Sequence, residues 1–339
     1  MFLILSFLHF IILCTKSRYV VMSPKNVIIT GSNSGIGKAA ALTFAKEGHV
    51  VIMACRNIEK SRPVQLEIIK NSNNTSVILK ALDVSSFKSI EQFCNELNME
   101  FNKIDILINN AAYFNHGSAY KLSTDGIEIT FATNVVGPFL LTHLLKNLLS
   151  RSDDPRVLNA GSNIIKHFLN PKKEIDFTNL EGEDIQNPSH SVYINYRNSK
   201  MALLMLTLKM ADFFKPEGIN VNSIQINGAT MSKESLQKVK PGWRIIARFQ
   251  NLFFRPPEYT ADLYYTICTS SDYRHYSGIY FNHWAEPMHP AVTNGGIFTD
   301  IKQALSSDVY PAYADQKEVS EQVWNRCREM TREYITLDR

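Results

Sequence analysis

The chain has few cysteines and no pattern among them. Five occur in 339 residues, with wide spacing and without any Cys-x-x-Cys motif. The odd number and the scatter argue against a disulfide framework and against a zinc or other metal site, and they are typical of a protein in a reducing compartment. The five positions are Cys14, Cys55, Cys94, Cys268 and Cys327.

Charge of either sign is also modest. Charged residues make up 20% of the sequence, and the formal net charge is +4. No basic stripe interleaved with aromatic residues occurs, so nothing in the sequence indicates a nucleic-acid partner. The sequence contains neither an internal repeat nor a low-complexity segment. One α/β domain with additions is the simplest organisation for a chain of this length.

Long apolar runs are missing except at the amino terminus. Met1 to Cys14 is almost wholly apolar, and Lys16, Arg18 and Lys25 follow it. A helix of this length reaches about 21 Å, short of the ~30 Å hydrocarbon core, and no basic residue precedes it as in a secretory signal. The basic flank predicts that residues 1–22 anchor residues 23–339 to a membrane with the domain facing the cytosol. The alternative is a soluble domain that begins at Met22.

A glycine-rich turn stands between a predicted strand, Val27 to Thr30, and a helix-forming run, Lys38 to Ala45. Glycine lets the backbone turn tightly and approach a ligand closely. The start of a helix offers unpaired N–H groups and the positive end of its dipole, which suit a pyrophosphate. A loop that is glycine-rich by chance is the weaker alternative, because strand, turn and helix all lie where phosphate binding needs them. The predicted cradle residues are Gly31, Asn33, Ser34, Gly35, Ile36 and Gly37.

A second motif pairs Tyr196 with Lys200. Four residues apart in a helix-forming run, the two side chains lie on one face, one turn from each other. A free tyrosine loses its proton only near pH ~10, and a neighbouring cation lowers that value. The pair is therefore predicted to act as an acid/base that reduces a carbonyl or oxidises an alcohol. Taken alone, the same spacing more often marks an amphipathic helix with a snorkelling lysine.

Predicted strands and helices alternate along the chain. Such alternation implies an α/β doubly wound (Rossmann-type) fold, with a mainly parallel sheet and helices on both faces. Ligands then bind beyond the carboxyl ends of the strands. The glycine turn, Asn110, Ser162 and the loop after Gln225 all lie at that edge. The expected helices cover residues 36–47, 59–71, 87–101, 125–149 and 194–214, and the expected strands cover 27–30, 49–54, 77–82, 104–109, 156–160 and 220–225.

The two motifs together resemble the short-chain dehydrogenase/reductase family over roughly residues 24–335. The glycine pattern, Thr-Gly-x-x-x-Gly-x-Gly, is that of the family's short branch. Met53 to Asn57 and Tyr196 to Lys200 are similar to the retinol-dehydrogenase-like group. The long interval between Ser162 and Tyr196 is most similar to the oxidoreductase domain of WW-domain-containing oxidoreductases, although no WW module is present.

This resemblance implies roles for residues at the ends of other strands. Asp83 and Val84 match the end of the third strand, which contacts adenine in the family. Asn110 and Ala111 match the family's Asn-Asn-Ala-Gly segment on strand four. Gly228 matches the glycine of the loop on the nicotinamide side. These residues are therefore expected to bind the cofactor.

The resemblance also implies a catalytic set. Tyr196 exchanges a proton with the substrate oxygen, and Ser162 hydrogen-bonds that oxygen. Lys200 lowers the pKa of the phenol and binds the nicotinamide ribose, beside which Tyr196 also lies. Asn134 holds a water that refills the proton chain. Read without the others, Ser162 is a turn serine and Asn134 a capping or core residue.

The end of the second strand indicates which nicotinamide cofactor is preferred. Sites for NAD commonly place an acid there, whereas an arginine suits the 2′-phosphate of NADP. This chain has Arg56 and no acid before Glu59. NADP(H) is therefore favoured as the cofactor, and NAD(H) is the alternative. Arg56 could also be an exposed surface arginine that has no part in cofactor binding.

Some positions depart from the family pattern. Ala112 replaces a glycine after Ala111, and Asn227 stands where the family commonly has proline. These departures support an alternative function, a nucleotide-binding interaction or regulatory protein with weak or lost turnover. Tyr193 is a competing phenol, but it has no lysine four residues later.

Apolar side chains at helical spacing fill residues 229–257, which are predicted to form a lid. A lid of this kind favours a small apolar carbonyl or alcohol substrate that is retinoid, steroid or lipid-like. A membrane-contacting helix and a subunit interface are the alternatives. The family resemblance further implies a homodimer. The apolar amino-terminal segment predicts a location at the endoplasmic reticulum membrane or, with a start at Met22, the cytoplasm, and a helical extension is expected at the carboxyl terminus.

Overall fold

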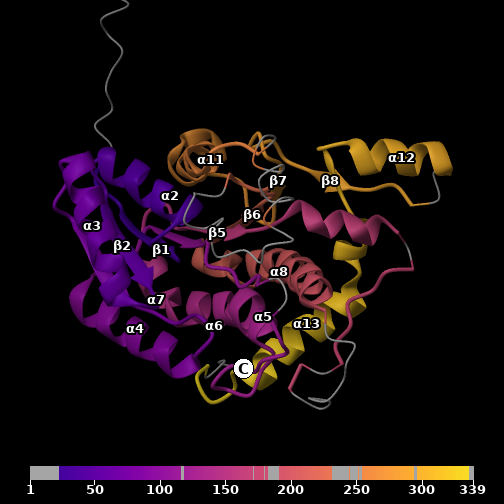
Figure 1. Ribbon diagram of the computed structural model, residues 1–339, viewed down its shortest axis with the longest axis horizontal. Coiled ribbons are helices and arrows are strands. Elements are labelled where there is room, and N and C mark those ends of the chain that lie inside the picture. Colours follow the sequence, from indigo (N-terminus) through magenta and orange to yellow (C-terminus); the bar gives the residue numbers. More distant parts are fainter. Residues whose placement is uncertain are drawn as a thin grey trace, which may run out of the picture.

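The computed structural model describes residues 23–115, 118–170, 172–178, 180–181, 191–230, 244, 251, 254–293 and 296–335. Its centre is a sheet of seven parallel strands in the order β3-β2-β1-β4-β5-β6-β7. Helices cover both faces of this sheet (Figure 1), which confirms the predicted doubly wound fold. The strands are β1 (Asn26–Thr30), β2 (Val50–Cys55), β3 (Val77–Ala81), β4 (Ile106–Asn109), β5 (Arg156–Ala160), β6 (Asn220–Ile224) and β7 (Tyr280–Phe281).

Apart from the edge strand β3, the strands of the sheet are buried on both faces, and their side chains alternate between two apolar clusters. Ile28 joins the cluster on one face of the sheet, and its neighbour Ile29 joins the cluster on the other. Figure 1 shows α2 and α11 above the sheet and α4, α6, α8 and α13 below it. The helices are α2 (Gly35–Lys46), α3 (Ile58–Ser72), α4 (Phe87–Glu100), α5 (Ile129–Phe131), α6 (Gly137–Leu144), α7 (Lys146–Leu149), α8 (Val192–Phe213), α11 (Pro257–Thr269), α12 (Ile297–Leu305) and α13 (Lys317–Met330).

The order of the strands reverses at the neighbouring pair β1 and β4. From β1 the chain moves outward to β2 and β3, and from β4 it moves the other way through β5, β6 and β7. The loops that leave β1 and β4 therefore diverge, and ligands of such sheets bind at this switch point.

The helix expected over residues 125–149 is interrupted. It consists of α5, a π-helical turn (Ala132–Val136), α6 and α7. Gly137 follows the turn, and a Cβ at this position would lie 2.2 Å from the carbonyl oxygen of Val84. A π turn widens the helix and often marks a functional site. Here it contains Asn134, one of the predicted catalytic residues.

Several short elements were not predicted. β7 has two residues, too few to show the alternation of apolar and polar side chains that marks a strand. It forms because the backbone N–H groups of Ser223 and Gln225 donate to the carbonyls of Ile279 and Phe281. A separate two-stranded parallel ladder joins β8 (His289–Pro290) to β9 (Val309–Tyr310). The helices α12 and α13 lie near the carboxyl end of the described residues, where a helical extension was predicted.

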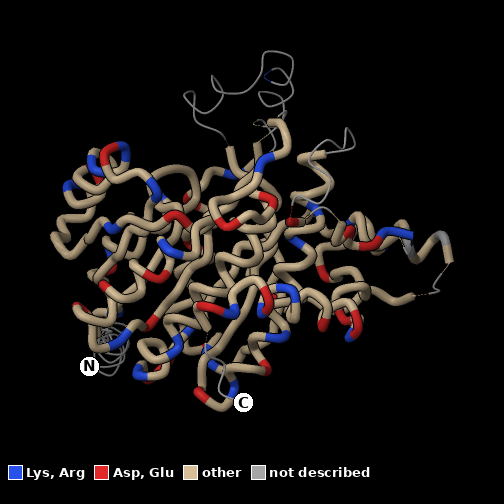
Figure 2. The backbone as a smooth tube through the Cα atoms, turned by 90° about the horizontal axis from the view of Figure 1, so that it is seen from below, with Lys and Arg blue, Asp and Glu red and all other residues tan. Residues whose placement is uncertain are grey.

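Charge is spread over the molecule. In Figure 2, basic and acidic residues are intermingled along the tube. Among the described residues, no helix is both long and apolar enough to cross a membrane. The predicted anchor, residues 1–22, and most of the predicted lid lie outside the described residues.

Candidate active site

The glycine turn leaves β1 through a conformation that favours glycine. Gly31 and Gly35 have φ angles of +67° and +53°, in the left-handed region. The N–H of Gly31 donates a hydrogen bond of 2.8 Å to the carbonyl of Ala54 on the neighbouring strand. Within the described part of the chain, the Ser34 side chain caps none of the first N–H groups of α2. The positive end of this helix is therefore open to an anion.

Gly37 locks the turn to the end of β4. A Cβ on Gly37 would lie 2.5 Å from Nδ2 of Asn110 and 2.5 Å from the carbonyl oxygen of Gly31. Nδ2 of Asn110 donates to the carbonyl of Thr30 at 2.9 Å. Oγ1 of Thr30 accepts from the N–H groups of Asn110 and Ala111 at 3.0 and 2.9 Å. No side chain fits at Gly37 without displacing backbone.

A cleft of about 1330 Å³ lies over this junction. The predicted cofactor residues Gly31, Asn33, Ser34, Gly35, Ile36, Gly37, Arg56, Asp83, Val84, Asn110 and Ala111 all line it. Gly228, Tyr196 and Lys200 are not among its lining residues, although Ala229 and Thr230 are. The structure therefore brings together the residues expected to hold the adenosine and pyrophosphate.

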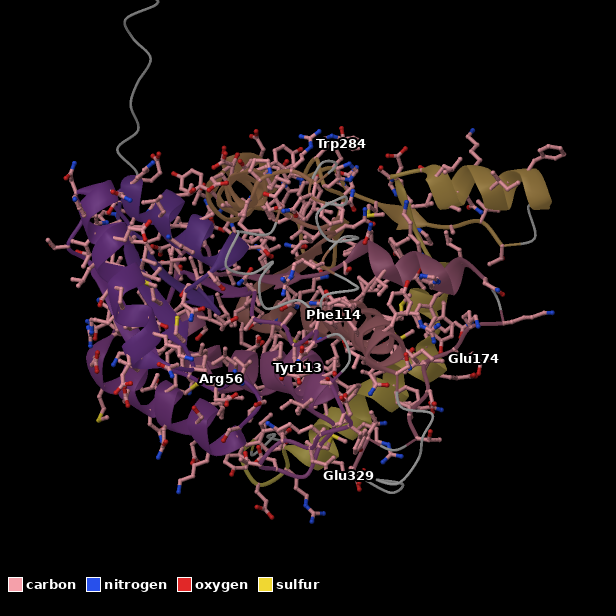
Figure 3. All side chains as sticks on the ribbon, in the orientation of Figure 1. Arg56, Tyr113, Phe114, Glu174, Trp284 and Glu329 are labelled. Carbon is pink, nitrogen blue, oxygen red and sulfur yellow. The ribbon has the colours of Figure 1, made fainter. Side chains whose placement is uncertain are left out.

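The rim of the cleft beyond β2 is basic. Arg56 is exposed there, on the indigo half of the chain in Figure 3. Lys60 also lines the cleft, a residue that the motif analysis missed, although its place in the first turn of α3 could have indicated it. Asn57 caps this helix by accepting from the N–H of Lys60 at 2.9 Å. Lys38 is already paired with Glu67 at 2.8 Å, so Arg56 and Lys60 are better placed to meet an anion.

Asp83 follows β3 at the opposite wall. Its Oδ1 accepts hydrogen bonds from the N–H and Oγ of Ser85, at 3.0 and 2.6 Å. The N–H of Asp83 donates to Oγ of Ser89 at 2.9 Å. These bonds fix the backbone from Leu82 to Val84 where it lines the cleft.

A second group of polar residues gathers where β5 meets α8. Tyr196 makes a side-chain hydrogen bond with Ser162, which directly follows Gly161 after β5. Lys200 is almost fully buried, and its Nζ donates to the carbonyl of Ala160 at 2.7 Å. The same Nζ lies 5.6 Å from the centre of the Tyr196 ring. The three residues predicted from separate parts of the sequence therefore lie together.

The expected lowering of the Tyr196 pKa by Lys200 is not seen in this structure and stays a prediction. Burial raises the pKa of Tyr196 above 10, and the hydrogen bond to Ser162 opposes that shift only in part. Burial also lowers the pKa of Lys200 to about 8. The Lys200 ammonium lies over the face of the phenol ring and donates to a main-chain carbonyl. Burial sets the direction of the Tyr196 shift.

Asn134 connects the π turn to two other elements. Its Oδ1 accepts from the N–H of Tyr113 at 2.7 Å, and its Nδ2 donates to the carbonyl of Tyr113 at 3.2 Å. Nδ2 also donates to Oγ of Ser199 at 3.0 Å, and Ser199 donates to the carbonyl of Tyr196 at 2.8 Å. The chain of bonds leads to the backbone of Tyr196. The predicted role of Asn134 in holding a water stays a prediction.

Two aromatic contacts were not predicted. The ring centre of Phe114 lies 4.4 Å from that of Tyr196. The hydroxyl of Tyr193 lies 2.5 Å from Nε2 of His167, and the Tyr193 side chain is 42% exposed. Tyr193 thus points to a histidine, whereas Tyr196 points to Ser162.

The loop after β6 holds the remaining predicted residue. Gly228 has a φ angle of +106°, and a Cβ there would lie 2.8 Å from the ring of Phe254. Nε2 of Gln225 donates to Oδ1 of Asn227 at 2.9 Å. Asn227, which stands in place of a proline, is therefore fixed by a side-chain bond, which proline could not make.

Comparisons with known proteins agree with this geometry. A family model described as short chain dehydrogenase matches residues 25–168. Retinol dehydrogenase 13 from Mus musculus is 31% identical over 76% of this chain and 75% of its own length. Retinol dehydrogenase 11 from Homo sapiens is 36% identical over 62% of each chain. The WW domain-containing oxidoreductase from Gallus gallus is 29% identical over 77% of this chain and 62% of its own length.

Solved structures share the fold. A short-chain dehydrogenase from Shigella flexneri 2a, in complex with NADP, superposes with a TM-score of 0.59. It is 20% identical, and the match covers 78% of this chain and 98% of that one. A protein from Mycobacterium paratuberculosis superposes with a TM-score of 0.60 over 91% of this chain.

Proposed function

We propose, from the premise that this chain belongs to the short-chain dehydrogenase family and to its retinol-dehydrogenase-like group, that it is an NADP(H)-dependent oxidoreductase for apolar carbonyls and alcohols. As a member of this family it acts on CH–OH or C=O groups. The finer assignment rests on one observation: a phosphate cradle and a Ser-Tyr-Lys group lie at the same edge of one sheet.

The chain's own residues fit a dinucleotide. The open start of α2 and the close approach at Gly37 suit a pyrophosphate. Arg56 and Lys60 at the cleft rim favour a 2′-phosphate over a free hydroxyl, which an acid would bind. A similar fold has been solved with NADP. When bound, this cofactor supplies or accepts the hydride.

Tyr196 is the proposed acid/base. Its raised pKa keeps the phenol protonated at neutral pH, so it can donate a proton to a substrate carbonyl oxygen. Ser162, already hydrogen-bonded to the phenol, orients the same oxygen. Lys200 is held over the face of the phenol ring, where it can bind the ribose hydroxyls of the nicotinamide. General acid catalysis of this kind contributes roughly 10²- to 10⁴-fold.

The proposed substrate is retinoid, steroid or lipid-like. Aromatic side chains of the loop after β4 support this choice, since Tyr113 lines the cleft and Phe114 lies against Tyr196. The names of the relatives point to a retinoid, and that activity is proposed for this chain by analogy alone. Membrane attachment through residues 1–22, at the endoplasmic reticulum, and a homodimer remain predictions.

A second candidate function is nucleotide binding with weak or lost turnover. Ala112 favours it, because its methyl group is part of the cleft wall where the family has a glycine. The loop at Asn227 is also differently fixed from one with proline.

One experiment separates the two candidates. Purified protein is tested with retinal, steroid ketones and aliphatic aldehydes in the presence of NADPH, and NADPH binding is measured directly by fluorescence. Turnover of an apolar carbonyl supports the oxidoreductase. Tight NADPH binding without turnover of any member of the panel supports the second function, and an absence of NADPH binding contradicts both.

A further inference from the structure

The loop that leaves β4 is clamped to the catalytic helix. Asn134 bonds both the N–H and the carbonyl of Tyr113, at 2.7 and 3.2 Å. The same amide reaches Ser199, which in turn bonds the carbonyl of Tyr196. The residue after the clamp, Phe114, therefore starts from a backbone position that is fixed relative to α8.

From this position the side chain of Phe114 covers the phenol. The two ring centres are 4.4 Å apart, with 37° between the ring planes. Tyr196 is thus held at its backbone by the bond from Ser199 and at its ring by Phe114. The Phe114 side chain is still 40% exposed, so its ring contacts Tyr196 and also faces outward. Figure 3 shows Phe114 near the middle of the molecule, next to Tyr113.

We infer that Phe114 positions the Tyr196 phenol and forms an aromatic wall for the substrate group that lies next to the reacting carbonyl. This inference deepens the proposed function and rests on it. A carbonyl that receives a proton from Tyr196 must come close to that ring, and the exposed part of Phe114 is adjacent. Aromatic rings prefer such tilted or offset contacts, worth roughly a 2- to 12-fold change in an equilibrium constant. Flat conjugated or aromatic carbonyls are therefore preferred over short aliphatic ones.

The surroundings of the phenol make the contact measurable. Burial is what raises the Tyr196 pKa, and Phe114 is part of what buries the ring. The other titratable groups that act on Tyr196 or face it are Lys200, Tyr264 and Tyr280. Burial raises the pKa of both tyrosines further above 10, so they stay neutral. Removing the Phe114 ring should therefore lower the Tyr196 pKa towards its ordinary value.

The kinetic test compares Phe114→Ala, Phe114→Leu and Phe298→Ala. Phe298 lies on α12 and is 91% exposed, which makes it a control for loss of a phenyl ring elsewhere. In both Phe114 variants, we expect kcat/KM with NADPH to fall about 10-fold more for an aromatic ketone than for a short aliphatic aldehyde. The KM for NADPH stays unchanged. An unchanged ratio of the two substrates in both variants overturns the substrate-wall role.

A second measurement does not need turnover. In protein with 13C-labelled tyrosine, the signal that is lost in Tyr196→Phe belongs to Tyr196. Phe114→Leu is expected to shift this ring signal, by removing the ring current, and to lower its titration midpoint, whereas Phe298→Leu changes neither. An unchanged Tyr196 signal in Phe114→Leu overturns the positioning role. If the signal shifts but no substrate is turned over, the proposed function fails and the contact itself stands.

Discussion

The two halves of the sheet contribute different kinds of chemical group to the site: one contributes mainly backbone and the other mainly side chains. Around β1, β2 and β4 the site is mostly backbone: a left-handed Gly31, the open start of α2 and main-chain N–H groups that donate to the hydroxyl of Thr30. Around β5, β6 and α8 it is mostly side chains: a phenol, a hydroxyl and a buried ammonium. The first half can bind an anion through conformation alone. The second half depends on how each polar group is solvated.

This difference predicts different consequences for single substitutions. A change in the first half should act through space, backbone or the charge at the cleft rim, and so alter cofactor binding. A change in the second half should act through proton transfer or desolvation, and so alter turnover or the pH dependence of stability, with the cofactor still bound.

The largest effect is expected for Tyr196→Phe. It removes the proton donor but keeps the ring that packs on Phe114. We expect kcat to fall roughly 10²- to 10⁴-fold, with NADPH binding unchanged. Steady-state kinetics and fluorescence titration of NADPH check this. If the Tyr196→Phe protein kept most of its activity, the proton donor would have to be another group, such as Tyr193.

The next effect tests the backbone half through Gly37→Ala. The added methyl group meets the Gly31 carbonyl and Asn110 at 2.5 Å, so the turn must shift, at a cost of about 1–3 kcal/mol in the free energy of unfolding. NADPH affinity should fall about 10-fold or more. The control Gly218→Ala, at a φ of +70° with open space around it, should lower stability but not NADPH affinity. Equal affinities for NADPH in the two variants would contradict the proposal that the glycine turn binds the pyrophosphate.

Lys200→Met tests desolvation in the second half. The pKa of Lys200 is about 8 in the folded protein, against an ordinary value of 10.5. The free-energy penalty for burying the charged form is therefore present in full below pH 8. As pH rises from 8 to 10.5 this penalty disappears. After allowance for the lost bond to Ala160, the variant should be roughly 2 kcal/mol more stable at pH 7.

Urea unfolding at several pH values measures this difference, which should shrink towards pH 10.5. Lys209→Met, on the same helix but paired with Glu321 at the surface, is the matched control and should not be more stable than wild type at pH 7. A Lys200→Met protein that is less stable than wild type at pH 7 would show that the buried ammonium is well compensated.

The smallest effect is expected for Arg56→Asp at the rim of the cleft. An acid there would bond a ribose hydroxyl and repel a 2′-phosphate. We expect the preference for NADPH over NADH, expressed as a ratio of kcat/KM values, to fall about 10-fold. Arg62→Asp, at an exposed site of α3, is a matched change of charge. An unchanged preference would withdraw the NADP(H) assignment.

The backbone half was the more predictable from sequence. Gly31 and Gly37 are needed for conformation and close approach, and those needs are visible in the residue type itself. The end of β2 was visible too, because Arg56 follows a buried apolar run. For this half, residue types and strand ends were sufficient.

The other half was predictable in its members but not in its energetics. The spacing of Tyr196 and Lys200 predicted their proximity, but burial, which sets both pKa values, depends on helices far away in the sequence. The π turn at Asn134 was hidden, since five residues inside a longer helical segment carry no pattern that separates a π turn from an ordinary helix. Phe114 had no signal, because a loop residue after a strand end is placed only by its tertiary contacts.

The most direct test of the account is a crystal structure of the protein with NADPH bound. We expect the pyrophosphate to rest on the first turn of α2 and the nicotinamide ring to reach the hydroxyl of Tyr196, so that both halves contact one ligand. A nicotinamide ring directed away from Tyr196, or a cofactor bound outside the glycine turn, would contradict it.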